Sequence, residues 1–128
     1  MEIKLYSKSD ETNLFTMLRS EGSEWKCYFG ENAEDSYKHA LKNSIIFVAY
    51  ENDVLCGYIR CRNDDGLGIY IYDLLVKKEF CGNNIGKKLI EKICTKYTGS
   101  TVYVMSDADE YYKKQGYLNI GSVFQITK

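Results

Sequence analysis

The stretch YDLLVKKEFCGNNIGKKL, residues 72–89, decides the fold because it runs from an apolar strand through a loop of small polar residues into a helix. Its beginning completes the mostly apolar run 67–76, which is typical of a strand buried in a sheet. The helix has one apolar face, whose side chains recur every four residues: Ile85, Leu89, Ile93 and Tyr97. We therefore predict a strand-loop-helix unit in which the helix begins near Asn84.

The loop of this unit is suited to bind an anion. The first-turn N–H groups of a helix have no partner inside it, and the helix dipole favours negative charge there. Gly82 and Gly86 would let a diphosphate approach the backbone closely, and Lys87 adds positive charge. A plain turn of small residues is the alternative, because the loop matches neither the GxxxxGK[ST] pattern nor the GxGxxG pattern.

The other segments predict a mixed α/β order. The predicted strands are 2–6, 45–50, 54–62, 67–76 and 101–105, with a strand-like tail over 117–127. The other predicted helices are 10–20, 33–41 and 107–115, and 21–31 is predicted to be a loop. An antiparallel meander followed by a β-α-β crossover gives a sheet of mixed direction.

Composition bounds the class of protein. With 128 residues, the chain fits one compact domain, 1–128. A net charge of −1 disfavours generic binding to nucleic acid. Five cysteines without a CxxC pair disfavour a disulfide framework or a zinc site, so we expect no metal and a reducing, cytoplasmic location. The N-terminus lacks a signal-peptide core, and no apolar run approaches the ~20 residues of a membrane span.

Two blocks of the chain resemble the GNAT superfamily of N-acetyltransferases. The acyl-CoA loop of that family reads Gln/Arg-x-x-Gly-x-Gly/Ala, and its register falls here on residues 81–86. The last glycine is kept as Gly86, whereas Cys81 replaces Gln or Arg and Asn84 replaces the middle glycine. The second block, YYKKQGY at 111–117, is similar to the family segment Phe-Tyr-x-Lys-x-Gly-Phe.

The resemblance implies a fold and a cosubstrate. The fold is α/β, with a mixed, mostly antiparallel sheet flanked by helices and a splayed strand pair that forms the acyl-CoA cleft. Acetyl-CoA is the implied acetyl donor, and backbone N–H groups near Leu75 or Val76 would polarise its carbonyl oxygen. The residues expected to bind it are Leu74, Leu75, Val76, Cys81, Gly82, Asn83, Asn84, Ile85, Gly86, Lys87 and Tyr112.

The resemblance also assigns catalytic roles. Tyr112 is the expected general acid, because a phenol with an ordinary pKa of about 10 stays protonated at neutral pH and can donate to the departing sulfur. Asp73 is either the base that deprotonates a primary amine or an acid that only orients it. The acidic and aromatic segment 21–31 would suit a cationic acceptor through cation–π contacts, or it is a surface loop pinned by Trp25.

A second function stays open beside N-acetyl transfer to a small-molecule or protein amine. Cys81 and Asn84, which depart from the family pattern, favour a non-catalytic module that binds acetyl-CoA, CoA or a protein. A third reading, a nucleotide-phosphate enzyme, lacks a metal-binding carboxylate near the loop. The identity of the amine stays open, as does the oligomeric state, because the tail strand can pair with a second copy into a homodimer or stay free.

Overall fold

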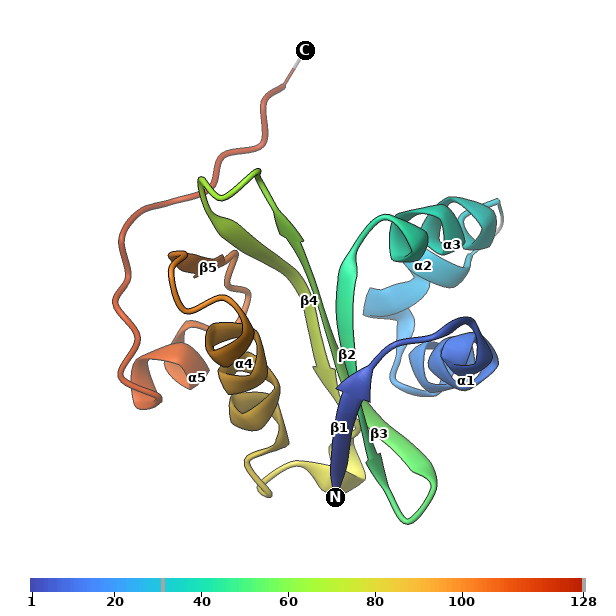
Figure 1. The fold of residues 1–128 in the computed structure, drawn as a ribbon. Coiled ribbons are helices and arrows are strands. Elements are labelled where there is room, and N and C mark those ends of the chain that lie inside the picture. The colour runs from blue at the N-terminus through green and yellow to red at the C-terminus, as the bar shows by residue number, and fades with distance from the viewer. Residues whose placement is uncertain (31, 128) are drawn as a thin grey trace.

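The computed structural model describes residues 1–30 and 32–127 (Figure 1). The strands are β1 (Glu2–Leu5), β2 (Ile45–Glu51), β3 (Val54–Asn63), β4 (Ile69–Val76) and β5 (Val102–Val104). The α-helices are α1 (Glu11–Ser20), α2 (Lys26–Phe29), α3 (Glu34–Lys42), α4 (Ile85–Lys96) and α5 (Asp109–Lys114). Short 3-10 turns lie at Lys8–Asp10, Ser23–Trp25 and Lys78–Phe80.

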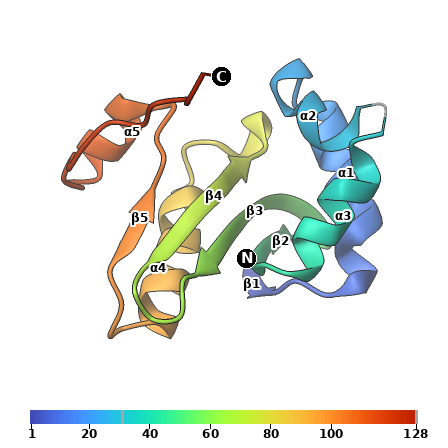
Figure 2. The ribbon, with the colours of Figure 1, turned by 90° about the horizontal axis from the view of Figure 1, so that it is seen from above.

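The five strands form one sheet in the order β1-β2-β3-β4-β5. Neighbours from β1 to β4 are antiparallel, whereas β5 runs parallel to β4 after the crossover through α4. Helices flank both faces: α1 to α3 lie on one side of the sheet, and α4 lies on the other (Figure 2). The predicted mixed, mostly antiparallel α/β sheet is confirmed.

Two apolar layers hold the sheet between its helices. The layer toward α1 and α3 consists of Leu14, Phe15, Met17, Leu18, Tyr37, Leu41, Ile46, Val48, Leu55, Tyr58 and Leu75. The layer toward α4 consists of Phe47, Ala49, Cys56, Ile59, Cys61, Ile69, Ile71, Ile85, Leu89, Ile90 and Ile93. Burying these side chains is the main force that fixes the helices on the sheet.

The last two strands separate after a short pairing. Residues 69–71 of β4 pair with 102–104 of β5, and β4 then continues to Val76 without β5 beside it. Its backbone groups from Tyr72 to Val76 therefore have no strand partner on that side among the described residues. This is the splayed pair that the sequence led us to expect.

A β-bulge in the pairing of β3 with β4 changes the side of the sheet to which alternate side chains of β4 point. Cys61 pairs with Ile71 and Arg60 pairs with Asp73, so Tyr72 is an extra residue on β4. Ile71 consequently packs in the layer of α4, whereas Leu75 packs in the layer of α1 and α3. Without this bulge, residues two apart would share one face.

Two predicted segments differ from the structure. The segment 21–31 was expected to be a loop, but it holds the turn Ser23–Trp25 and helix α2. Trp25, Tyr28 and Phe29 are spaced like one helix face, and all three pack on the layer of α1 and α3. The tail 117–127 was expected to be strand-like, but it pairs with no strand of the described chain, and most of its apolar side chains are strongly exposed.

Candidate functional site

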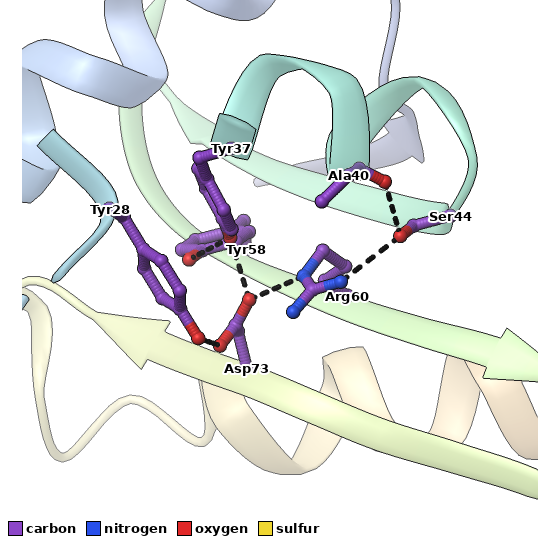
Figure 3. Close-up of polar contacts among 7 residues, drawn as sticks. All are labelled: Tyr28, Tyr37, Ala40, Ser44, Tyr58, Arg60 and Asp73. Carbon is purple, nitrogen blue, oxygen red and sulfur yellow. Dashed lines mark hydrogen bonds and ion pairs between the residues drawn. The ribbon is translucent and has the colours of Figure 1, made fainter. Parts of the chain in front are cut away.

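Asp73 stands at the centre of a buried polar network between β4 and the helices (Figure 3). Its Oδ2 accepts hydrogen bonds from Nε of Arg60 at 2.5 Å and from the hydroxyl of Tyr37 at 2.6 Å. Its Oδ1 accepts a hydrogen bond from the hydroxyl of Tyr28. Only 3% of Asp73 is exposed, so any proton that it exchanges must pass through one of these partners.

Arg60 compensates the charge of this carboxylate. Burial works against the charged guanidinium, but the adjacent Asp73 and its hydrogen bond raise the pKa of Arg60 above its ordinary value. The guanidinium carbon also lies 5.3 Å from the ring centroid of Tyr37 and 5.4 Å from that of Tyr72, and Nη1 donates to Ser44 at 3.2 Å. The pair is thus electrically neutral and held from several sides.

Sequence reasoning found Asp73 but missed its partners. The available signal was Arg60, a charged side chain inside the otherwise apolar part of a strand predicted to be buried. Tyr28 and Tyr37 carried no signal of their own, because they are two of 12 tyrosines in the chain. Their rings stack at a centroid distance of 3.9 Å and an angle of 14°, which aligns both hydroxyls with Asp73.

The segment that precedes α4 has the geometry of an open helix start. Asn84 takes a left-handed conformation with φ of 59°, Gly82 has φ of 93°, and residues 81–84 are exposed. Asn84 makes no side-chain capping bond, and the first turn contains no acidic residue. The side chain of Ile85 is buried in the layer of α4, while Lys87 is exposed. The first-turn N–H groups are therefore not satisfied by a side-chain cap.

Tyr111 lies against this helix start. A Cβ atom placed on Gly86 would meet the Tyr111 hydroxyl at 2.5 Å and Cγ2 of Val76 at 3.7 Å. The absence of a side chain at Gly86 is therefore what lets the phenol of α5 approach α4. The contact also brings the end of β4, the start of α4 and α5 together at one corner.

Tyr112 packs beside Tyr111 in a small aromatic cluster. The two rings meet edge-to-face at 5.1 Å, and Tyr117 lies 6.4 Å from Tyr112. Burial raises the pKa of Tyr112 to about 12, with further contributions from Asp107, Tyr111 and Tyr117. The phenol is half-buried and stays protonated at neutral pH.

The predicted site residues therefore form two groups around β4. Asp73 and Leu75 belong to the side of the sheet covered by α1 to α3. Leu74, Val76 and Tyr112 pack against the layer of α4, where the segment 81–87 begins the helix. Between them lies the edge of β4 that β5 leaves unpaired.

Glu21 is a further side chain at the end of β4. Its Oε1 accepts a hydrogen bond from the backbone N–H of Lys78 at 2.9 Å, which ties the residue after α1 to the residues after β4. In the described ranges 1–30 and 32–127, no group of three or more His, Cys, Asp or Glu could hold a metal ion. No helix of that part of the chain is long and apolar enough to cross a membrane.

The chain matches a known protein family and a curated protein sequence. Residues 10–127 match the family described as "Acetyltransferase (GNAT) domain". A curated relative, the uncharacterised N-acetyltransferase ycf52 of Pyropia yezoensis, is 29% identical over 91 residues, which cover 63% of this chain. The match spans about half of that relative, 52% of its length.

Solved structures have the same fold at low sequence identity. A GNAT family acetyltransferase of Streptococcus pneumoniae superimposes with a TM-score of 0.78 at 17% identity, covering 99% of this chain and 98% of the other. A ribosomal-protein-alanine N-acetyltransferase of Brucella melitensis gives 0.76 at 17%, covering 100% and 99%. An aminoglycoside N-acetyltransferase in complex with CoA gives 0.75 at 12%, covering 99% and 98%.

Proposed function

The chain belongs to the GNAT acetyltransferase family, and from that premise we propose that it transfers an acetyl group from acetyl-CoA to a primary amine. The observation that carries the proposal is the unpaired edge of β4, which leads to the uncapped start of α4. An extended pantetheine arm fits such an edge as an added strand, and a diphosphate fits such a helix start. The similar aminoglycoside N-acetyltransferase was solved with CoA, which supports the same cosubstrate here.

The proposed contacts to acetyl-CoA come from the edge of β4 and the start of α4. The diphosphate is received by backbone N–H groups between Gly82 and Lys87, whose segment is exposed up to Asn84. The pantetheine arm runs along the backbone of 74–76, and an N–H group near Leu75 or Val76 polarises the thioester carbonyl. Cys81 takes part through its backbone, because its Sγ already contacts the carbonyl oxygens of Val76 and Lys77 at 3.8 and 3.5 Å.

The proposed reaction forms a bond between the amine nitrogen and the acetyl carbon, and the C–S bond breaks. The departing thiolate takes a proton from Tyr112, whose phenol is protonated at neutral pH. A proton lost by the amine reaches Asp73 only through the groups that contact it, since both carboxylate oxygens already accept hydrogen bonds. Asp73 therefore acts on the acceptor through one of these contacting groups and not by direct contact.

Acetyl-CoA binding and thiol release test the proposal. With acetyl-CoA at about 100 times its Kd, the free energy of unfolding should rise by about 2.7 kcal/mol, and an amine panel should give thiol release. Lys87→Glu should weaken binding on the order of tenfold, because it reverses the charge beside the diphosphate. Lys96→Glu, at the other end of the same helix, is the matched control. Absence of a thermal shift would contradict the proposal.

The alternative is a non-catalytic module that binds acetyl-CoA or CoA. The specific observation in its favour is the replacement of family residues by Cys81 and Asn84 in the binding segment. A thermal shift with acetyl-CoA but no thiol release across the amine panel would select this alternative. The two functions are thus separated by one pair of measurements.

A further inference from the structure

Tyr28 differs from the other side chains that contact Asp73. Tyr37 is 3% exposed and Arg60 is 8% exposed, so neither can reach a bound molecule from solvent. Tyr28 is half-buried and comes from α2, which is a single short turn between Gly22 and Gly30. Of the three donors to Asp73, Tyr28 is therefore the only one that is not buried, and Figure 3 shows its hydroxyl beside the carboxylate.

The hydrogen-bond direction at Tyr28 decides what it can offer to a ligand. Its hydroxyl proton is donated to Oδ1 of Asp73, a carboxylate that can only accept while it is ionised. The phenolic oxygen then presents only lone pairs to a neighbouring molecule. Stacking on Tyr37 and contact with Trp25, whose ring lies at 6.0 Å, hold this orientation.

Tyr28 also lies on the side of the sheet that the proposed function leaves for the amine acceptor. Tyr28 and Asp73 belong to the side of the sheet that α1 to α3 cover, whereas the segment 81–87 and Tyr112 belong to the side of α4. If the coenzyme occupies the side of α4 and the edge of β4, the side of α2 is left for the acceptor. A group that only accepts hydrogen bonds suits an amine, which is a donor.

We propose that Tyr28 binds the acceptor, with its phenolic oxygen accepting a hydrogen bond from an N–H group of a primary amine while Asp73 holds the phenolic proton. This inference rests on the proposed acetyltransferase function and adds a residue that discriminates between acceptors. It assigns Asp73 and Arg60 to positioning, since they orient Tyr28 without touching the amine. A tertiary amine, which lacks an N–H donor once neutral, would not be held in this way.

Tyr28→Phe removes the proposed contact, and Tyr50→Phe is its matched control. The hydroxyl of Tyr50 donates to Oδ1 of Asp10 at 2.6 Å, so both variants remove a half-buried phenol that is bound to an aspartate. Tyr50 lies on β2 beside β1, and its hydroxyl hydrogen-bonds with Asp10 and Asn13, neither of which belongs to the proposed site. The two variants should therefore lose similar stability, and only Tyr28→Phe should change the kinetics of the acceptor.

For Tyr28→Phe we expect kcat/KM for the amine to fall on the order of tenfold, with the Kd of acetyl-CoA unchanged within about twofold. Tyr50→Phe should keep both constants within about twofold of the wild type. The inference is overturned if Tyr28→Phe leaves kcat/KM for the amine unchanged, or if both variants lower it equally. Wild-type thiol release, measured first with the same amines, separates a failure of this inference from a failure of the proposed function.

Discussion

At the scale of single residues, the strands of the site carry two opposite charges that neutralise each other. Arg60 on β3 and Asp73 on β4 are register partners, so their side chains meet across the sheet. Because the carboxylate is charged and buried, removing Arg60 alone would leave an unpaired charge in the core and cost several kcal/mol, about 3–5 by analogy with other buried pairs. The pair therefore supports the packing of α2 and α3 on β4, because Asp73 also accepts hydrogen bonds from the hydroxyl groups of Tyr28 and Tyr37.

Tyr112→Phe tests the general acid at the same scale. Turnover should fall about a hundredfold or more, since a positioned acid contributes roughly 10²- to 10⁴-fold, while acetyl-CoA affinity changes little. Tyr117→Phe is the matched control, because Tyr117 packs on Tyr112 but is more exposed. The measurement is kcat beside the Kd of acetyl-CoA, and normal turnover in Tyr112→Phe would refute the assignment.

At the scale of elements, two glycines with different roles shape the start of α4. Gly82 has a positive φ of 93°, which most side chains adopt only with strain. Gly86 is helical, and its hydrogen makes room for the hydroxyl of Tyr111 from α5. One glycine therefore serves the path of the backbone, and the other serves the contact between two helices.

A double-mutant cycle tests the contact between α4 and α5. Gly86→Ala alone gains helix propensity but places Cβ 2.5 Å from the Tyr111 hydroxyl, whereas in the Tyr111→Phe background the nearest remaining ring atom is 3.5 Å away. We expect the alanine to be more favourable by about 1 kcal/mol in the Tyr111→Phe background, measured by urea unfolding. Gly82→Ala, whose Cβ would meet nothing within 4 Å, should be destabilising by the same amount in both backgrounds. Additive free energies in the Gly86 cycle would contradict the contact.

At the scale of the whole molecule, burial of phenols links folding to alkaline pH. Tyr28, Tyr37 and Tyr58 have pKa values raised above the ordinary value, first by burial. Burial also raises the pKa of Tyr6 and Tyr112 to about 12. In the unfolded chain these groups would ionise near pH 10. Below that pH, the contribution of these raised pKa values to the free energy of unfolding is fully present.

The free energy of unfolding should consequently fall as pH rises from about 10 toward 12. In that window the folded chain holds more protons than the unfolded chain, so the slope of stability against pH is negative. Urea unfolding at several pH values would measure this slope. Tyr6→Phe should make the slope shallower, because it removes one of the phenols whose pKa burial raises. A flat profile through this window would contradict the linkage.

Some of the site could be predicted from local patterns. The helix beginning near Asn84 and the meander before it depend on apolar spacing and turn residues, which act over a few residues, whereas the separation of the last two strands was expected only from the family resemblance. The segment 21–31 was expected to be a loop because Gly22 and Gly30 flank it, although Trp25, Tyr28 and Phe29 have the spacing of one helix face. The tail 117–127 has the apolar content of a strand but lacks a partner in the described chain.

The sequence by itself determined the order of the elements, the family and the segment that begins α4, because each is written in neighbouring residues. Only the tertiary structure decided the surroundings of Asp73. Its partners come from α2, α3 and β3, and the extra residue Tyr72 turns it toward them. No local pattern encodes which of 12 tyrosines will meet one carboxylate, since that depends on helix packing and strand register over distances of 13 to 45 residues along the chain.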